Sequence, residues 1–253
     1  MINTIFLFIA GGIAGLMAGL LGIGGATIMV PVYLYYFKLN ALFPLEQQFH
    51  MAIGCSLAVI LISALVATIS NYKHHLIEYK IAKIFLPGLG LGIILGTLLS
   101  KVIPALVLKK LFSIFLIVLM LSMFKNNSQS KQQSLSTAAI TSIAILVGML
   151  NALFGIAGGI IITPVLVRMG VKIKRAISTS IFLSIPISLF GNISLNLSSN
   201  YFLIDWQVVL PTALASTIFT PLGSKLGRLI SSDWLKKLFA IFLLLIALEM
   251  LTS

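Results

Sequence analysis

The sequence predicts an all-α integral membrane protein, with about eight transmembrane helices in two four-span repeats. The 253-residue chain is 59% hydrophobic and only 9% charged, whereas ordinary soluble domains carry about 25% charged residues. Its mean hydropathy is +1.14, and a soluble core could not bury so much apolar surface. Several phrases of the sequence also occur twice, once in each half of the chain.

Eight apolar segments can be distinguished. Lipid-exposed backbone must satisfy its own hydrogen bonds, and the runs are much longer than the roughly 10-residue strands of a membrane barrel, so we expect helices. The segments cover residues 4–37, 49–71, 79–100, 104–124, 135–168, 175–198, 203–224 and 234–252. A stretch rich in Ser, Gln and Asn divides them into an N-terminal membrane repeat (1–124), a polar linker (125–134) and a C-terminal membrane repeat (135–253).

The first and fifth segments share an apolar-glycine phrase. Residues 22–31 read Gly-Ile-Gly-Gly-Ala-Thr-Ile-Met-Val-Pro, and residues 155–164 read Gly-Ile-Ala-Gly-Gly-Ile-Ile-Ile-Thr-Pro. A straight helix over either segment would be roughly 50 Å long, against a hydrocarbon core of about 30 Å. We therefore expect each segment to break at its glycines. If one piece only re-enters the membrane the repeats are parallel, and if it crosses fully they are inverted.

The later segments repeat as well. Residues 96–123 align with residues 223–250 at a constant offset of 127, and 13 of the 28 aligned positions are identical. Glu78 corresponds to Asp205 at the same offset, whereas the glycine phrases align at an offset of 133. The offset therefore changes only in loops, where insertions are tolerated.

Loop charge predicts the orientation. The loops after the first, third, fifth and seventh segments carry twelve of the seventeen Lys and Arg residues. These are Lys38, Lys101, Lys109, Lys110, Arg168, Lys172, Lys174, Arg175, Lys225, Arg228, Lys236 and Lys237. The positive-inside rule places them in the cytoplasm and both chain termini outside a cell (inner) membrane.

Composition argues against several other functions. The net charge of +12 lies mostly between apolar runs, where it suits topology and lipid headgroups rather than nucleic acid. Cys55 is the single cysteine, and the three histidines show no ligand spacing, so neither a metal nor another cofactor is expected. A hydrolase built on Cys55, Ser56 and His50 would lack an oriented base, so we do not expect an enzyme.

The glycine phrases are the strongest candidates for a binding site. A helix that restarts after a glycine break presents free N–H groups and a positive dipole end, which together form an anion site. Tight helix packing is the alternative, and we favour it for Gly11, Gly15 and Gly19. The candidate substrate-binding residues are Gly22, Gly24, Gly25, Pro31, Ser56, Asn151, Gly155, Gly158, Gly159, Pro164, Thr179 and Ser180.

The sixth segment carries a polar stripe. Its members are Ser180, Ser184, Ser188, Asn192 and Asn196, four residues apart. On a helix such a stripe either lines a polar path or hydrogen-bonds neighbouring helices. No Lys, Arg, Asp or Glu lies unambiguously in the middle of a segment, so coupling through a buried acid is not expected.

The two glycine phrases ending in Pro, each followed by a helix opening rich in Ser and Thr, resemble the TauE/SafE sulfite exporter family. Ile204-Asp205-Trp206 and the repeated Leu-Lys-Lys-Leu-Phe fit the same family. The resemblance covers almost the whole chain and implies a cell-membrane permease for small organic or sulfur oxyanions such as sulfite. The chain departs at Ala157, where the first copy has Gly24, and Asn151 corresponds to Ala18, so the half-sites are not equivalent.

The sequence therefore predicts a secondary transporter for a small anion, in contact with membrane lipids and without a nucleic-acid partner. A non-transporting scaffold or assembly factor and an anion channel are the alternatives. A homo-oligomer is left open, as are the identity of the anion and the direction of transport.

Overall fold

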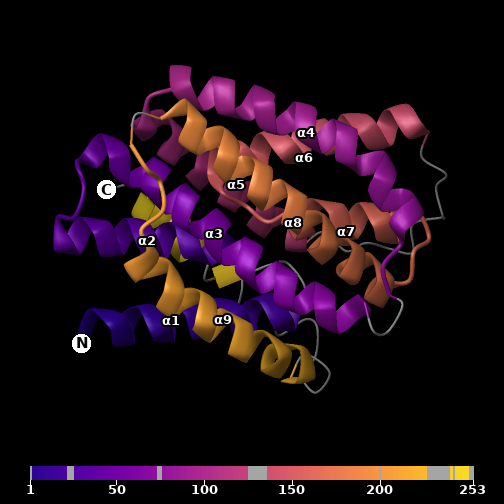
Figure 1. The fold of residues 1–253 in the computed structure, drawn as a ribbon, viewed down its shortest axis with the longest axis horizontal. Helices are drawn as coiled ribbons and strands as arrows, with labels where there is room; N and C mark the ends of the chain where they lie inside the picture. Colours follow the sequence, from indigo (N-terminus) through magenta and orange to yellow (C-terminus); the bar gives the residue numbers. More distant parts are fainter. Residues whose placement is uncertain are drawn as a thin grey trace.

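A computed structural model of the chain shows a bundle of helices (Figure 1). It describes residues 2–21, 26–72, 76–124, 136–199, 201–226, 240–241 and 243–250. The helices are α1 (Ile2–Leu21), α2 (Ala26–Asn40), α3 (Leu45–Tyr72), α4 (Tyr79–Val102), α5 (Ala105–Phe124), α6 (Thr137–Phe154), α7 (Gly159–Arg168), α8 (Ile173–Ser198) and α9 (Trp206–Leu226). Residues 240–241 and 243–250 are also helical. Gly22, Gly24 and Gly25 lie outside the described residues.

Five of the described helices have the length and apolar surface of membrane spans. Stretches of α1, α3, α4, α6 and α8 are long and apolar enough to cross a bilayer, whereas α7 is a shorter apolar helix. Large apolar side chains lie exposed along the outside of the bundle, as Leu91, Ile94 and Leu98 do on α4. An apolar belt of this kind favours contact with lipid over contact with water.

Helices α1 and α2 form a hairpin. The Asn3 side chain near the start of α1 donates a hydrogen bond to the Asn40 side chain at the end of α2, at 3.0 Å. The rings of Phe6 and Tyr36 stack one turn further in, with centroids 6.2 Å apart. The end of α2 therefore returns to the end of the bundle at which α1 begins.

Two helix pairs join the halves of the chain by close backbone contact. Helix α1 runs parallel to α9, and Gly11 and Gly15 lie so close to the backbone of Thr212 and Ser216 that a Cβ would come within 2.5 Å of a carbonyl oxygen. Helix α4 runs parallel to α6 in the same way, with Gly92 against the backbone of Ile145. Small residues allow this approach, and the resulting van der Waals contact holds membrane helices together.

The contacts of the two pairs correspond residue by residue. Gly15 packs on the Ser216 carbonyl, while Gly148, 133 positions after Gly15, packs on the carbonyl of Leu89, 127 positions before Ser216. These are the two offsets at which the sequence repeats. The duplication of the sequence is therefore accompanied by a duplication of helix contacts.

Each end of the bundle brings together loops that the positive-inside prediction assigned to opposite sides of the membrane. Helices α4 and α8 begin at the same end, because Glu78 before α4 pairs with Arg175 in the first turn of α8 at 2.5 Å. The loop charges placed these residues on opposite sides of the membrane, and that grouping is wrong. Its physical cause is the return of α2 to the end of the bundle at which α1 begins, which reverses the direction of the later helices relative to the prediction.

The glycine contacts predict how α4 responds to substitution. Gly92→Ala is expected to lower the free energy of unfolding in detergent by about 1–3 kcal/mol, because its Cβ would overlap the Ile145 carbonyl of α6. Gly90 lies two residues away on the same helix with open space where its Cβ would be. Gly90→Ala is therefore expected to leave the melting temperature unchanged or to raise it. Equal destabilisation by both changes would contradict the packing described.

The α1–α2 hairpin predicts a cross-link. Cysteines at positions 3 and 40 are expected to form a disulfide under mild oxidation, because the two native side chains are in hydrogen-bonding contact. Cysteines at positions 3 and 172 are the control, since Lys172 lies at the opposite end of the bundle beside α8. Gel mobility without reductant, after cleavage between the two positions, reports the result. Cross-linking of the control pair instead would overturn the hairpin.

Candidate functional site

The break between α6 and α7 lies in the described part of the chain and is made by glycine. Helix α6 ends at Phe154, and Gly155 takes a left-handed backbone conformation with a φ of 63°. Its N–H donates to the Asn151 carbonyl at 2.7 Å. A side chain would be strained at this φ, so glycine ends the helix here. Helix α7 starts four residues later at Gly159.

Helix α3 contacts this break through Ser56. The buried Ser56 hydroxyl donates to the Gly155 carbonyl at 3.1 Å. The approach is close, because a Cβ at Gly155 would lie 3.1 Å from the Ile53 Cα. Residues 99 positions apart in the sequence therefore meet at the point where the fifth apolar segment loses its helical geometry.

Asn151 occupies the last turn of α6 and is 1% exposed. Its side-chain Nδ2 donates to the Ile156 carbonyl. Its Oδ1 has no hydrogen-bond partner among the described residues and faces Gly191 of α8, where a Cβ would lie 3.1 Å away. The repeat-related position in α1 is Ala18, so this amide has no counterpart in the first half.

Helix α8 is tied to α3 by a neighbouring amide. In the orientation that satisfies both of its groups, Asn192 donates to the Gly54 carbonyl and accepts from the Ala58 N–H, each at 3.1 Å. The side chain therefore bridges backbone groups of α3 one turn apart. It holds α3 and α8 together just beside Ser56.

The break leaves backbone donors without an acceptor among the described residues. The structure records no acceptor within the described residues for the N–H groups of Ile156, Ala157 and Gly158, and all three residues are buried. These groups precede the first turn of α7, whose dipole places positive partial charge at the same point. Buried unpaired donors of this kind are rare, and they favour a negatively charged ligand.

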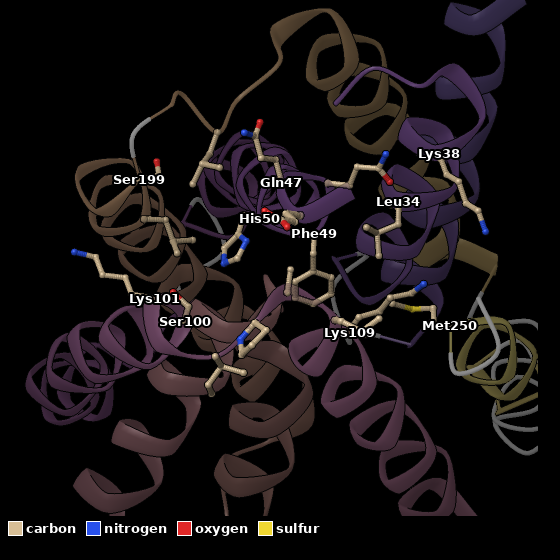
Figure 2. A pocket seen from close by; sticks show the side chains of 18 of the residues that line it. Leu34, Lys38, Gln47, Phe49, His50, Ser100, Lys101, Lys109, Ser199 and Met250 are labelled. Atoms are coloured by element: carbon tan, nitrogen blue, oxygen red, sulfur yellow. The ribbon is translucent and has the colours of Figure 1, made fainter. Parts of the chain in front are cut away.

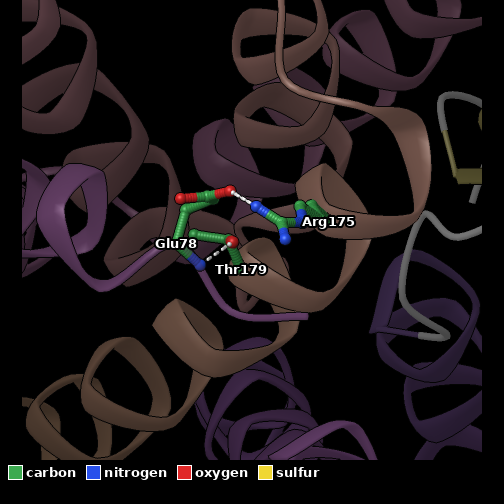
Figure 3. Close-up of polar contacts among 3 residues, drawn as sticks. All are labelled: Glu78, Arg175 and Thr179. Atoms are coloured by element: carbon green, nitrogen blue, oxygen red, sulfur yellow. Dashed lines mark hydrogen bonds and ion pairs between the residues drawn. The ribbon is translucent and has the colours of Figure 1, made fainter. Parts of the chain in front are cut away.

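The hydroxyls of Thr179 and Ser180 bond residues other than those of the break. Thr179 accepts from the Glu78 N–H at 2.9 Å, beside the ion pair with Arg175 (Figure 3). Ser180 accepts a hydrogen bond from Thr163 and donates to the Ala176 carbonyl, at 2.9 Å each.

The two repeated prolines have different surroundings. Pro164 is exposed on α7, whereas Pro31 of α2 is buried and lines a cavity. Gly158 and Gly159 are buried at the start of α7.

A contact equivalent to that of Thr179 occurs in the other half of the chain. The Asp205 N–H before α9 donates to Cys55 Sγ at 3.4 Å, just as the Glu78 N–H donates to Thr179. Glu78 and Asp205 correspond at the repeat offset. A helix junction is therefore repeated in the two halves, although Cys55 lies inside α3 and not, as the sequence had predicted, at its start.

Serines of the α8 stripe bond their own helix. Ser184 donates to the Ser180 carbonyl at 3.0 Å, and Ser188 donates to the Ser184 carbonyl at 2.6 Å. Both are buried. Their hydroxyl donors are therefore used inside α8, and only Asn192 reaches across to α3.

A cavity of about 920 Å³ opens at the end of the bundle opposite the ion pair (Figure 2). It is lined by the end of α2, the start of α3, the α4–α5 junction and the end of α8. Its charged and titratable side chains include Lys38, Lys101, Lys109, Glu46 and Glu249. Lys109 interacts electrostatically with both Lys38 and Glu249.

The cavity was not predicted from the sequence. Its lysines were assigned to topology because each stands at the end of an apolar run, and only the fold shows that they surround one space. Tyr201, between α8 and α9, also lines it. Burial, and then the negative charge of Glu46, raises the pKa of the Tyr201 hydroxyl above its usual range.

The chain is similar to several bacterial and archaeal proteins. It is 26% identical to the probable membrane transporter protein YunE of Bacillus subtilis, over 98% of this chain and 97% of that protein. It is 28% identical to a probable membrane transporter protein of Haemophilus influenzae, over 96% of each. It is 31% identical to the probable membrane transporter protein MJ0441 of Methanocaldococcus jannaschii, over 87% of this chain and 84% of that protein. No solved structure matches it.

A sequence model of the family described as sulfite exporter TauE/SafE matches residues 7–250. The matched residues include both glycine phrases, Ser56, Asn192 and the glycines that pack α1 on α9 and α4 on α6. The chain therefore belongs to the sulfite exporter TauE/SafE family.

Proposed function

We propose that the protein is a secondary transporter that carries a small anion, such as sulfite or an organosulfonate, across the cell membrane. The observation that carries the proposal is the row of buried, unpaired N–H groups of Ile156, Ala157 and Gly158 at the start of α7. An anion bound there would satisfy donors that otherwise lose their hydrogen bonds to water without replacement. The family and the transporter relatives support the same class of function.

The surroundings of the break favour an anion over a neutral solute. The start of α7 adds its dipole, and Ser56 adds a hydroxyl that can turn from the Gly155 carbonyl toward a ligand. Because the donors at the break are neutral, no carboxylate is needed to balance their charge. Neutral donors in a low-dielectric site bind an anion without holding it as tightly as a buried lysine would.

The fold supports an inverted arrangement of the two halves in the membrane. The α1–α2 hairpin enters from the cavity end, and the α6–α7 pair enters from the other end, where α4 and α6 both begin. Each half then contains an odd number of passes, as inverted repeats require.

Loop charge can be counted again on this arrangement. Among the described residues, the cavity end carries four Lys and Arg residues, namely Lys38, Lys101, Lys109 and Lys110. The described residues toward the opposite end carry seven, namely Lys80, Lys83, Arg168, Lys172, Lys174, Arg175 and Lys225. The positive-inside rule then places that side in the cytoplasm, with the cavity and both termini outside.

The proposal predicts a specific effect of Ser56. Ser56→Ala is expected to raise the KM for anion uptake into proteoliposomes by about 10- to 150-fold, because one hydrogen bond to a charged group is worth about 1.5–3 kcal/mol. Ser63→Ala is the matched control on α3, since the Ser63 hydroxyl bonds only the Ile60 carbonyl of its own helix at 3.1 Å. Ser56→Thr should restore most of the affinity. Unchanged KM in Ser56→Ala would rule this hydroxyl out of the site.

A second prediction concerns the break itself. Gly158→Leu is expected to abolish transport, because its side chain would cover the unpaired N–H groups between Ile162 and Ile187. The assay is uptake of labelled sulfite and of a panel of organosulfonates, with counter-flow to separate a carrier from a channel. A Gly158→Leu protein that elutes as wild type and transports at full rate would show that the anion binds elsewhere. Absence of flux in the wild type would favour a scaffold.

A further inference from the structure

The last turn of α6 ends in buried carbonyl groups for which the described residues supply no donor. The Asn151 carbonyl accepts from the Gly155 N–H. For Ala152, Leu153 and Phe154, which are 0%, 6% and 4% exposed, the structure records no donor to the carbonyl oxygen within the described residues. The negative end of the α6 dipole lies at the same place. A cluster of oxygen atoms in this setting favours a positively charged partner.

An independent observation at the same helix end is the side chain of Asn151. Its Oδ1 is buried and has no hydrogen-bond partner in the described part of the chain. The amide cannot simply be turned over, because Nδ2 donates to the Ile156 carbonyl and a reversed amide would set two acceptor oxygens against each other. The orphan atom is therefore an acceptor, and it is held in place.

Space beside this oxygen is left by Gly191. A Cβ at that position would lie 3.1 Å from Asn151 Oδ1, so any larger residue of α8 would crowd it. Across the break, the Ser56 hydroxyl contacts the Gly155 carbonyl from α3. Oxygen atoms from α3 and α6 therefore surround the break, while α8 contributes the residue without a side chain.

We infer that Asn151 Oδ1 and the carbonyl oxygens at the end of α6 bind a monovalent metal cation of the Na⁺ class. All these ligands are neutral, and the described residues bring together no cluster of three or more His, Cys, Asp or Glu side chains that could hold a metal ion. Neutral amide and backbone oxygens at a broken helix suit a monovalent cation, whereas divalent ions favour carboxylates. The first half has Ala18 in place of Asn151, so the amide ligand has no counterpart there.

The position of the site implies coupling to the anion, and this step rests on the proposed function. The donors of Ile156, Ala157 and Gly158 follow the acceptors of Ala152, Leu153 and Phe154 directly in the chain. A cation at the end of α6 and an anion at the start of α7 would attract each other across a short distance in a low-dielectric medium. Binding of either ion should then strengthen binding of the other by the same factor.

Binding of Na⁺ to the purified protein in detergent, with no anionic substrate, tests the site. The melting temperature is measured while NaCl replaces choline chloride at constant ionic strength. Wild-type protein is expected to gain about 3 °C or more at saturating Na⁺. Asn151→Ala is expected to weaken the Na⁺ response about tenfold or more. Thr217→Val is the matched control, because it removes another unpartnered oxygen, on α9.

Two further variants keep the inference testable if Asn151→Ala does not fold. Asn151→Asp places a carboxylate oxygen where Nδ2 donates to the Ile156 carbonyl, so it lowers stability without a cation, but its negative charge is expected to increase Na⁺ affinity. Gly191→Ala crowds Oδ1 and is expected to reduce Na⁺ affinity without removing any ligand. A wild-type protein whose melting temperature is the same in Na⁺ and choline, or an Asn151→Asp protein with unchanged Na⁺ affinity, would overturn the cation site.

Transport measurements separate this inference from the proposed function. Na⁺-dependent stabilisation without flux of any tested anion would leave the cation site standing and contradict the transporter. Anion flux that is unaffected by a Na⁺ gradient, in a protein that Na⁺ does not stabilise, would leave the transporter standing and contradict the cation site. The expected result is flux that increases with Na⁺ in the wild type and loses that dependence in Asn151→Ala.

Discussion

The structure depends on backbone-to-backbone contact between α1 and α9 and between α4 and α6. In lipid, apolar side chains gain little by leaving the solvent, so dispersion contacts between closely packed helices must supply the cohesion. Each pair joins a helix from one half of the chain to a helix from the other. The two halves are thereby held in register. Helices α3 and α8 are then fixed against each other, with Asn192 bridging the α3 backbone at Gly54 and Ala58.

This framework permits a break that would be costly elsewhere. The chain between α6 and α7 gives up helical hydrogen bonds in a buried place, where each unpaired polar group is destabilising. Three features fix the end of α6 at Gly155: the left-handed backbone conformation of this glycine, the hydrogen bond from Ser56 and the packing of Ile53. The N–H groups before α7 and the carbonyl groups at the end of α6 then border the break and do not hydrogen-bond one another. Rigid support around unpaired polar groups is the arrangement expected of a preorganised binding site.

Much of this could be predicted from the sequence, because duplication and glycine placement are local signals. The repeat offsets of 133 and 127 reappear in the contacts of Gly15 and Gly148. Helix α6 ends at Gly155, the first residue of the second glycine phrase, and the Ser56 hydroxyl contacts this residue. The sequence also shows that the two halves differ at the position that holds Asn151 in one and Ala18 in the other.

Other features depend on contacts that no local pattern encodes. The return of α2 could not be deduced, since a 15-residue helix is long for a re-entrant piece and short for a span. The prediction of which loops share one side of the membrane was wrong for that reason. Thr179 and Ser180 were chosen for their position in a helix opening, yet their hydroxyls bond Glu78 and Thr163. The cavity gathers residues from helices far apart in the sequence, so only the fold could show it.

The crossed pairing of the halves has a consequence for biogenesis. Helix α1 leaves the ribosome first, but the glycines that it uses for contact wait for Thr212 and Ser216, about 200 residues later. At a synthesis rate of about 5–20 residues per second, α1 stays in the bilayer for roughly 10–40 s before its partner exists. During that interval its small-residue face is available to any other helix. Assembly of this protein is therefore a late, post-insertion event, and the first half is vulnerable to wrong partners until the chain is almost complete.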